Sequence, residues 1–257
     1  MKQRLDQALV GKGLVMSRSQ AESYIKLGDV KVDGVVVTKS GTLVSDTAQL
    51  EVTAAAQYVS RGALKLDSVA QALKLDFRDK NVLDVGSSTG GFTDYALQHG
   101  ARKVIAVEVG SNQLHPTLRN NPKVELHEQT DIRDFVISSL SRDRARNSSE
   151  PVGITGMPDI VVADVSFISL RDILPPIAAL IGTQTAVIAM VKPQFEAENS
   201  NLKHKGVIKN DRMRRDILKD FEAWVHSYFV IVDKADSEVR GAKGNQERFY
   251  YLRKHRN

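Results

Sequence analysis

The chain has 257 residues, a formal net charge of +5 and no cysteine. That length allows one large domain with a small one beside it, and 42% hydrophobic with 26% charged residues is typical of a soluble protein. The absence of cysteine excludes disulfides, thiolate metal ligands and a cysteine nucleophile, and it suits a reducing compartment. Because the first ten residues also lack the apolar core of an export signal, we expect a cytoplasmic protein.

Positive charge is concentrated at the carboxyl end of the chain. Residues 201–257 contain 14 Lys and Arg against 8 Asp and Glu, whereas the first 200 residues are close to neutral. A basic surface favours a polyanionic partner such as nucleic acid. A charge surplus by itself is usually only a solvated face, so it supports a partner only together with other features.

The beginning of the chain is predicted to form two short helices. Leu5 and Leu9 lie near helical spacing in the first helix. Ser17 and Gln20 have the spacing of a capping box, in which the serine caps the second helix and the glutamine reaches back to its start. Gly28 is predicted to end that helix in the left-handed conformation.

A β-hairpin follows, with strands at Val30–Val32 and Val35–Val37 joined by the turn dipeptide Asp33–Gly34. Two helices and a hairpin within residues 1–52 resemble the S-four RNA-binding domain, a small α+β fold. The matching residues are Arg4, Leu5, Asp6, Ser17, Arg18, Ala21, Ile25, Gly28, Val30, Val32 and Gly34. Because that domain rests on RNA phosphates, the resemblance implies RNA contacts at Arg4, Arg18, Lys26 and Lys31. A folding module without RNA contacts is the alternative.

A linker is predicted at residues 53–60, where alanines are frequent, and a second domain at residues 61–257. An apolar series that runs to Leu75 predicts a helix at the start of this domain. Arg61 and Lys65 lie four residues apart on that helix and therefore share a face. Such a pair is normally solvated, but a helix at this place can lie across the mouth of a ligand cleft.

A strand, a small-residue turn and a helix form the centre of the second domain. Val82–Val85 reads as a buried strand, Gly86–Gly90 carries no large side chain, and helical periodicity begins at Phe92. In α/β sheets this arrangement directs backbone amides and a helix N-terminus at a ligand. The spacing is neither GxGxxG nor a P-loop, which disfavours a nicotinamide site or a nucleoside-triphosphate site. A generic turn without a ligand is the alternative.

Acidic residues after the next two strands indicate the kind of ligand. Lys103–Val107 ends in Glu108, at the distance where doubly wound folds place a carboxylate for ribose hydroxyls. Val124–His127 leads to Asp131, which could meet an adenine amino group. The segments DVGSSTGGF, AVEVG and EQTD resemble an S-adenosylmethionine-dependent methyltransferase. The resemblance implies cofactor contacts at Ser60, Arg61, Gly62, Asp84, Gly86, Ser87, Ser88, Thr89, Gly90, Gly91, Phe92, Glu108, Val109, Asp131 and Asp164.

Two further strands end in charged residues. Ile160–Asp164 ends in an aspartate, and Val187–Val191 is followed at once by Lys192. Ligands bind at the carboxyl ends of strands in open α/β sheets, so we expect Asp164 and Lys192 to face the crevice of the glycine turn. A structural ion pair is the alternative.

The carboxyl-terminal part is predicted to contain a polar segment at 194–210 that could act as a lid, and then a basic helix at 211–225. A strand at Phe229–Val232 and a last strand at Arg248–Leu252 follow, with Glu247 in the loop beside the site. The uncharged segment 173–191 is long enough to span a membrane, but two prolines near its start and Gly182–Thr183 in its middle interrupt it. A helix followed by a buried parallel strand explains that segment better.

The segments VSRGALKL, DVGSSTGGFTD, AVEVGSNQLHPTLR, ADVSFISL, MVKPQFE and GNQE, in this order, resemble the TlyA family over the whole chain. These proteins, often called hemolysin A, are ribosomal RNA 2′-O-ribose methyltransferases with an S-four domain before an FtsJ-like, Rossmann-like domain built on a seven-stranded, mostly parallel sheet. The resemblance implies that the cofactor is S-adenosylmethionine, the partner is ribosomal RNA and no metal is needed. It implies a catalytic tetrad at Lys65, Asp164, Lys192 and Glu247. Glu108 stands where Asp is usual.

The expected chemistry is activation of a ribose hydroxyl. A lysine serves as a base only when burial or a neighbouring cation lowers its pKa, and Lys65 beside Lys192 would supply that cation. Lys192 is therefore the candidate base and Lys65 the positioning residue, with Asp164 and Glu247 orienting the ammonium groups. Members of the TlyA family with short termini modify only the large subunit, so the resemblance implies a cytidine of large-subunit RNA as the target. The alternatives are an inactive ribosome-assembly factor that binds RNA and a membrane-active hemolysin.

Overall fold

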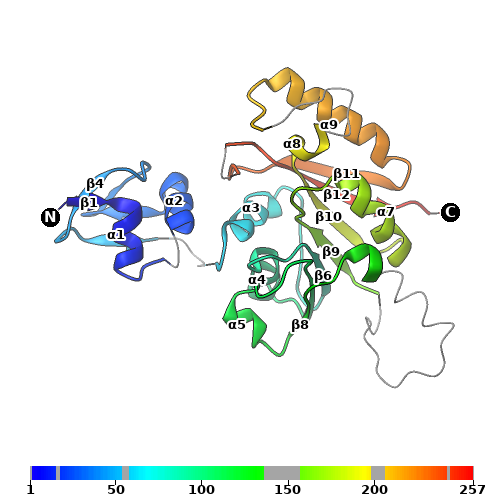
Figure 1. Ribbon diagram of the computed structural model, residues 1–257, viewed down its shortest axis with the longest axis horizontal. Coiled ribbons are helices and arrows are strands. Elements are labelled where there is room, and N and C mark those ends of the chain that lie inside the picture. The colour runs from blue at the N-terminus through cyan, green and yellow to red at the C-terminus, as the bar shows by residue number, and fades with distance from the viewer. Residues whose placement is uncertain are drawn as a thin grey trace.

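The computed structural model describes residues 2–15, 18–53, 58–135, 157–197, 206–241 and 244–256. They form a small amino-terminal domain beside a larger α/β domain (Figure 1). The fold therefore agrees with the predicted α+β module followed by a doubly wound sheet. The predicted boundaries at residues 52 and 60 remain predictions, since residues 54–57 of the predicted linker lie outside the described residues.

The amino-terminal domain contains two helices and five short strands. They are β1 (Lys2–Arg4), α1 (Leu5–Gly11), α2 (Arg18–Leu27), β2 (Val30–Val32), β3 (Val35–Val36), β4 (Leu43–Ser45) and β5 (Leu50–Val52). β1 pairs with β4, and β2 lies between β3 and β5 in a second antiparallel sheet. The two helices and the hairpin were predicted, whereas β1, β4 and β5 were not.

Local backbone chemistry explains the predicted boundaries in this domain. Gly28 has φ +84°, so α2 ends in the left-handed conformation that glycine adopts without strain. Asp33 and Gly34 both have positive φ values, +50° and +81°, as a two-residue hairpin turn requires. The capping box remains a prediction because Ser17 lies outside the described residues.

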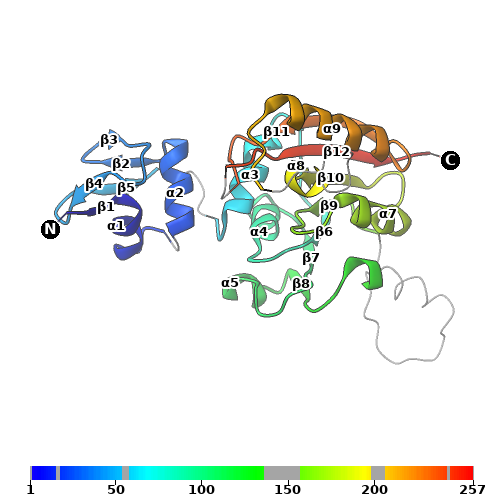
Figure 2. The ribbon, with the colours of Figure 1, turned by 45° about the horizontal axis from the view of Figure 1, so that its top comes forward.

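Tyr58 joins the two domains. Its backbone N–H donates to the Tyr24 hydroxyl at 3.2 Å, and its carbonyl accepts a hydrogen bond from the Gln20 side chain. Its ring is buried, 5.7 Å from the ring of Tyr95 in the larger domain. α2 accordingly lies against the first helix of that domain (Figure 2), and one apolar core runs through both domains.

The larger domain contains a seven-stranded sheet in the order β11-β12-β10-β9-β6-β7-β8. Strands β6 to β10 are parallel, and β12 runs antiparallel between β10 and β11. The strands are β6 (Asn81–Val85), β7 (Lys103–Val107), β8 (Val124–His127), β9 (Ile160–Ala163), β10 (Ala186–Val191), β11 (Phe229–Asp236) and β12 (Arg248–Lys254). The apolar runs that predicted β6, β7, β9 and β10 reflect burial on both faces of the sheet, whereas β8 is an edge strand of intermediate exposure.

Helices cover both faces of this sheet. They are α3 (Arg61–Ala70), α4 (Gly91–Gln98), α5 (Pro116–Arg119), α7 (Leu170–Leu180), α8 (Pro193–Glu196) and α9 (Asp211–Val225). Side chains alternate along a strand, so Val82 lies in the apolar cluster of α3 and α4 while Leu83 lies in the cluster of α7 and α9. The sheet is thus the middle layer of three (Figure 1).

Two predictions about helices have different outcomes. The helix expected to reach Leu75 is wrong at its end, because α3 stops at Ala70 and Lys74 has φ +51°. Leu73 is still buried, so its place in the apolar series reflects the core and not helix geometry. The helix and strand expected within residues 173–191 are α7 and β10. Among the described residues, no helix has the length and apolarity that a membrane span needs.

Candidate active site

The candidate site lies where the chain order of the sheet reverses. From β6 the chain proceeds outward through β7 and β8, and it returns to the other side of β6 as β9 and β10. The loops that follow the carboxyl ends of β6 and β9 therefore diverge, and they leave a crevice between them. A cavity of about 530 Å³ opens there.

Glycines allow the loop after β6 to pass close to its neighbours. Gly86 has φ +81°, and a Cβ atom there would lie 2.7 Å from the Asp164 carbonyl oxygen. A Cβ atom on Gly91 would lie 2.4 Å from Ser60 Oγ, the atom that caps α3 through the N–H of Gly62. Only a chain without side chains at these positions can bring α3 and the loop together around a ligand.

Asp84 lies at the bottom of the site and is 1% exposed. Thr93 Oγ1 donates to its Oδ2 at 2.6 Å, whereas its buried Oδ1 has no hydrogen-bond partner among the described residues. Burial raises the pKa of Asp84 to about 7, and the nearby Asp164 carboxylate adds to this shift. The unsatisfied oxygen is an acceptor that a cationic ligand group could use.

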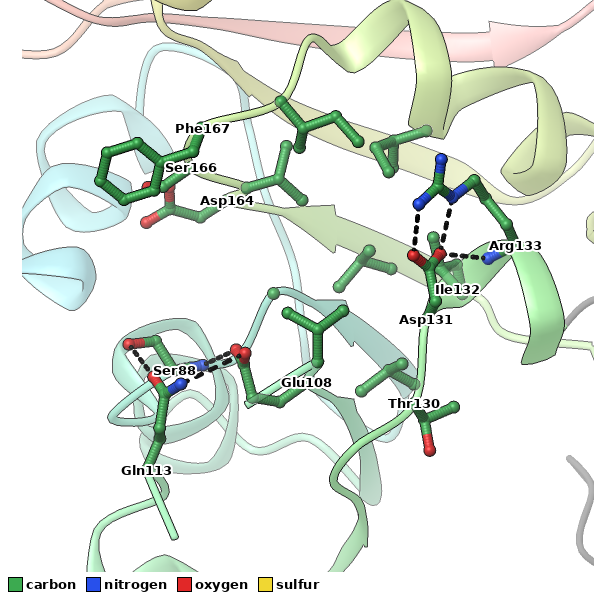
Figure 3. A pocket seen from close by; sticks show the side chains of 17 residues that line it. Ser88, Glu108, Gln113, Thr130, Asp131, Ile132, Arg133, Asp164, Ser166 and Phe167 are labelled. Atoms are coloured by element: carbon green, nitrogen blue, oxygen red, sulfur yellow. Dashed lines mark hydrogen bonds and ion pairs between the residues drawn. The ribbon is translucent and has the colours of Figure 1, made fainter. Parts of the chain in front are cut away.

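Glu108 follows β7, as predicted, and its carboxylate binds the glycine loop. Oε2 accepts from the Ser88 N–H and Oε1 from the Gly110 N–H, each at 2.8 Å. Gln113 lies beside both Ser88 and Glu108, and its side-chain oxygen accepts from Ser88 Oγ at 3.3 Å. Figure 3 shows Ser88, Gln113 and Glu108 together on one side of the cavity. Glu108 is 7% exposed, and its carboxylate is held in place with lone pairs remaining for hydroxyl donors.

Asp131 lies on another side of the same cavity and is paired with Arg133 (Figure 3). Arg133 Nη2 is 2.6 Å from Asp131 Oδ2, and hydrogen bonds from the guanidinium lower the pKa of this aspartate. A ligand group that binds Asp131 would therefore share it with Arg133, and the contact to an adenine amino group stays a prediction. No pattern in the sequence had indicated this ion pair.

Most of the predicted cofactor residues line the site. The larger cavity is lined by Gly86, Ser88, Glu108, Val109, Asp131 and Asp164. A smaller adjoining pocket is lined by Ser60, Gly62, Asp84, Gly86, Ser87, Ser88, Thr89, Gly91, Phe92 and Asp164. Gly90 lines neither of these two; with φ +97° it makes the turn beneath Leu114 and Leu118. Arg61 also lines neither.

The four residues of the predicted tetrad form two ion pairs. Lys192 Nζ is 2.5 Å from Asp164 Oδ1, and Lys65 Nζ is 3.1 Å from Glu247 Oε1. Both ammonium groups are largely buried, with side-chain exposure of 10% each. Each carboxylate therefore lies against one lysine, as expected. Which carboxylate pairs with which lysine was known only from the structure.

Ser166 and Phe167 belong to the site and were not predicted individually. Lys192 Nζ donates to Ser166 Oγ at 2.7 Å. Phe167 is 92% exposed, has φ +65° and lies 5.4 Å from the ring of Phe195. An exposed phenylalanine in a left-handed backbone conformation is strained and is typical of functional sites. The segment ADVSFISL contained both residues, but nothing in it indicated that the phenylalanine would face solvent.

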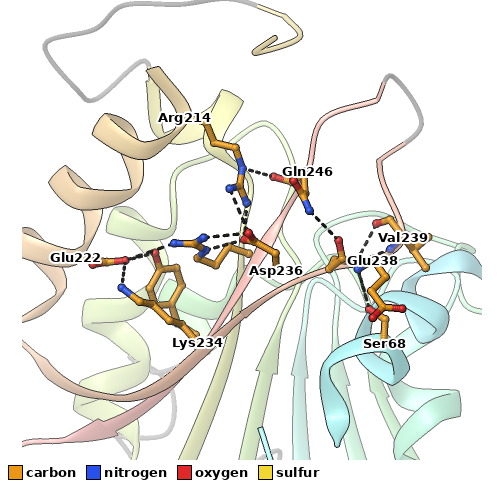
Figure 4. Close-up of polar contacts among 11 residues, drawn as sticks. Ser68, Arg214, Glu222, Lys234, Asp236, Glu238, Val239 and Gln246 are labelled. Atoms are coloured by element: carbon orange, nitrogen blue, oxygen red, sulfur yellow. Dashed lines mark hydrogen bonds and ion pairs between the residues drawn. The ribbon is translucent and has the colours of Figure 1, made fainter. Parts of the chain in front are cut away.

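Glu247 lies in the loop just before β12, beside a polar network at the end of β11. Figure 4 shows the network members Arg214, Asp236 and Gln246. The Glu247 carbonyl accepts from the Ser237 N–H at 3.0 Å. Arg214 of α9 donates to the Gln246 carbonyl at 3.2 Å and pairs with Asp236 at 2.5 Å. Arg214 of the basic helix α9 therefore fixes the loop that carries Glu247. The expectation that this basic region meets a polyanion stays a prediction.

The remaining predictions concern RNA and metal. Arg4 and Arg18 share the carboxylate of Asp6, Lys26 is exposed on α2, and Lys31 lies on β2. No group of three or more His, Cys, Asp or Glu among the described residues is arranged to hold a metal ion. The predicted lid at residues 194–210 lies partly outside the described residues.

The site combines a crevice at the reversal of strand order with a glycine loop and an acid after β7. Together with the two lysine–carboxylate pairs, this arrangement is typical of a methyltransferase. Residues 58–254 match the FtsJ-like methyltransferase family. Residues 3–50 match the S4 domain, which is the same as the S-four domain named above. The chain belongs to the FtsJ-like methyltransferases, in the group of TlyA and hemolysin A proteins.

Relatives are similar over nearly the whole chain. Hemolysin A of Brachyspira hyodysenteriae is 36% identical over 95% of this chain and 97% of its own length. The 16S/23S rRNA (cytidine-2′-O)-methyltransferase TlyA of Mycobacterium tuberculosis is 36% identical over 97% and 89%. A solved structure described as a hemolysin, from Streptococcus thermophilus, is 35% identical with a TM-score of 0.68, covering 98% of this chain and 88% of that one.

Proposed function

We propose that this protein transfers a methyl group from S-adenosylmethionine to the ribose 2′-hydroxyl of a cytidine in large-subunit ribosomal RNA. The observation that carries the proposal is the pair of buried lysine–carboxylate contacts, one of which includes Asp164, a residue that lines the crevice. The substrate is supported by relatives: the names of the Mycobacterium tuberculosis and Campylobacter jejuni proteins both include 23S rRNA and cytidine-2′-O. The match to an S4 domain supports RNA binding by the amino-terminal domain.

The residues of the crevice fit S-adenosylmethionine. Asp84 Oδ1 offers a buried acceptor to an ammonium group, and Glu108 offers lone pairs to ribose hydroxyls. Glycines at positions 86 and 91 leave room that a Cβ atom would fill. When bound, this cofactor supplies an electrophilic methyl group on a sulfonium centre.

The raised pKa of Asp84 leads to a testable pH dependence. An ammonium group binds the ionised carboxylate, so below pH 7 binding must first remove a proton from Asp84. We expect the association constant of S-adenosylmethionine to fall with decreasing pH, by up to about tenfold per unit. Calorimetry across the range from about pH 8 to about pH 6 measures it. Asp84→Asn should bind more weakly and lose this pH dependence; an unchanged slope in that variant would contradict the assignment.

The chain's own residues can activate the substrate hydroxyl. We assign Lys192, in its neutral amine form, as the group that accepts the 2′-hydroxyl proton and becomes an ammonium, because contacts to Asp164 and Ser166 hold its Nζ atom in place. Lys65 is assigned to position the ribose, with Glu247 holding it. Enclosure of both lysines removes competing water and holds the reacting oxygen in line.

Phe167 offers an aromatic face next to the candidate base. It follows Ser166, which contacts Lys192, and its ring is almost wholly exposed beside Phe195. Exposed aromatic rings bind unpaired RNA bases by stacking, which contributes roughly 1–3 kcal/mol per base. We assign Phe167 to the base of the methylated nucleotide.

Replacing Phe167 with glycine tests this assignment without backbone strain, since glycine tolerates φ +65°. Single-turnover methyl transfer at limiting RNA is expected to fall roughly tenfold to a hundredfold, as the loss of one stacking contact implies. Cofactor affinity should stay near the wild-type value, and Phe167→Tyr should retain the rate. If cofactor affinity falls in parallel with the rate, Phe167 covers the cofactor and not the base.

Methylation of unmodified ribosomal subunits tests the function itself. The purified protein, radiolabelled S-adenosylmethionine and separated large or small subunits are incubated, and ribose methylation is mapped at nucleotide resolution. We expect one cytidine of the large subunit to be modified. Modification of small subunits would overturn the restriction to the large subunit, and no transfer to either would favour an inactive assembly factor.

A further inference from the structure

We propose that Glu196 is a positioning residue that holds Phe167 in its exposed conformation, so that the ring can stack on the base of the substrate nucleotide. Glu196 is the last residue of α8, four positions after Lys192, and is 1% exposed. Its carboxylate binds the end of the loop that carries Phe167. The role of the ring rests on the proposed function, whereas the anchoring of the loop rests on the contacts of Glu196.

The carboxylate of Glu196 binds the start of α7. Oε2 accepts from Ser169 Oγ at 2.6 Å, and Oε1 accepts from the Leu170 N–H at 2.8 Å. The first N–H groups of a helix have no partner inside it, and a carboxylate lies favourably at this end of the helix dipole. The Arg171 guanidinium has Nε 3.6 Å from Oε2, and it also pairs with Asp220 of α9. Glu196 therefore fixes residues 169 and 170 to α8.

The loop between β9 and α7 is thus held at both ends. At its beginning, the Asp164 N–H donates to the Val85 carbonyl at 3.0 Å, and the Asp164 carboxylate pairs with Lys192. Phe167 lies between the two fixed ends, with φ +65°. A residue other than glycine keeps such a conformation only where its surroundings determine it. Release of the end at Ser169 should therefore let Phe167 relax to an ordinary conformation.

α8 also supplies the ring that Phe167 contacts. Phe195 directly precedes Glu196, and its ring centroid is 5.4 Å from that of Phe167. One turn of the chain therefore carries both the neighbouring ring and the carboxylate that fixes the loop. Asp84 and Glu108, the residues assigned to the cofactor, lie at the ends of other strands, so a change at Glu196 should spare cofactor affinity.

Replacing Glu196 with alanine is expected to lower single-turnover methyl transfer at limiting RNA by roughly tenfold, and no further than Phe167→Gly does, because stacking on one ring is what is lost. At saturating RNA the rate should stay near wild type, since a higher concentration compensates for weaker substrate binding. A purely structural role would instead lower both rates alike, in proportion to the folded fraction. An equal fall at saturating RNA, or a parallel fall in cofactor affinity, overturns the proposal.

Two variants separate the hydrogen bonds from charge and from stability. In Glu196→Gln the amide oxygen can accept from the Leu170 N–H and the amide N–H can donate to Ser169 Oγ, so both rates should be near wild type. A rate at limiting RNA as low as that of Glu196→Ala would assign the effect to charge, and the proposal fails. Asp159→Ala is the matched control. Its carboxylate accepts from the Asn81 N–H at 2.8 Å at the opposite end of β9, so its loss should leave both rates unchanged.

A double-mutant cycle shows whether Glu196 acts through Phe167. In the Phe167→Gly background, Glu196→Ala should lower the rate at limiting RNA only slightly further, whereas independent effects multiply and would contradict the proposal. Where the thermal midpoint shows that Glu196→Ala is not folded, Ser169→Ala takes its place in the cycle, because it removes one of the two hydrogen bonds.

Hydrogen exchange of residues 166–172 tests the anchor without RNA or cofactor. Loss of the acceptor should speed exchange of the Leu170 N–H in Glu196→Ala, and exchange should be unchanged in Asp159→Ala. Unchanged exchange in Glu196→Ala overturns the anchor. Failure of the proposed function has a different signature: the wild-type protein then methylates no ribosomal RNA, whatever the exchange of this segment shows.

Discussion

Replacing Lys192 with alanine is expected to lower single-turnover methyl transfer by roughly 10²-fold or more, the usual contribution of a general base. The substitution removes the nitrogen that contacts Asp164 and Ser166 and leaves the glycine loop and Glu108 unchanged. Affinities for cofactor and RNA should therefore stay near wild type. Rapid-quench measurement with excess enzyme follows the chemical step directly.

Lys192→Arg separates a base from an electrostatic anchor. Arginine keeps the charge opposite Asp164 but cannot accept a proton near neutral pH, so we expect it to be as inactive as alanine. Lys192→Met controls for side-chain volume at this 9% exposed position, and Lys219→Ala, an exposed lysine on α9, controls for charge. If arginine restores most of the rate, Lys192 only holds the substrate and the proton leaves by another route.

Deleting residues 1–52 is expected to abolish methylation of ribosomal subunits while leaving cofactor binding near wild type. Phosphate contacts dominate RNA affinity, and Arg4, Arg18, Lys26 and Lys31 all lie in the deleted part. The cofactor crevice is built from the larger domain and from Ser60. Methylation assays and calorimetry on the truncated protein measure the two effects independently.

The contacts of Tyr58 with the amino-terminal domain provide a control for this deletion, because they can be weakened separately in the full-length protein. Truncation removes the Gln20 and Tyr24 side chains that bind the backbone of Tyr58, but the Tyr95 ring remains beside it. Tyr24→Phe in the full-length protein removes the hydroxyl that accepts from the Tyr58 N–H and that also hydrogen-bonds the Gln20 side chain. If truncation weakens cofactor binding and Tyr24→Phe does so too, these contacts support the crevice. Unchanged methylation by the truncated protein would show that the amino-terminal domain does not supply RNA affinity.

The sequence alone was sufficient wherever structure follows from neighbouring residues. The buried strands β6, β7, β9 and β10 appeared as apolar runs, and the Asp33–Gly34 turn followed from backbone preferences. The placement of Gly86, Glu108 and Asp164 around one cavity also followed, because parallel strands present their carboxyl ends at one edge. The strands β1, β4 and β5 have three residues each and lack a turn signal such as the Asp33–Gly34 pair between β2 and β3, so they were not found.

Only the tertiary structure decided which charged groups meet. Lys65 and Glu247 are 182 positions apart, and no local pattern distinguishes their pairing from a pairing of Lys65 with Asp164. The exposure of a side chain also depends on distant parts of the chain. By residue type alone, a phenylalanine is expected in the core and an aspartate at the surface, yet Phe167 is exposed and Asp6 is buried. Their actual environments depend on which strands pair across the sheet and on which helix packs beside them. Those choices are made by the whole folded chain, because the free energy of each contact depends on what the rest of the molecule buries around it.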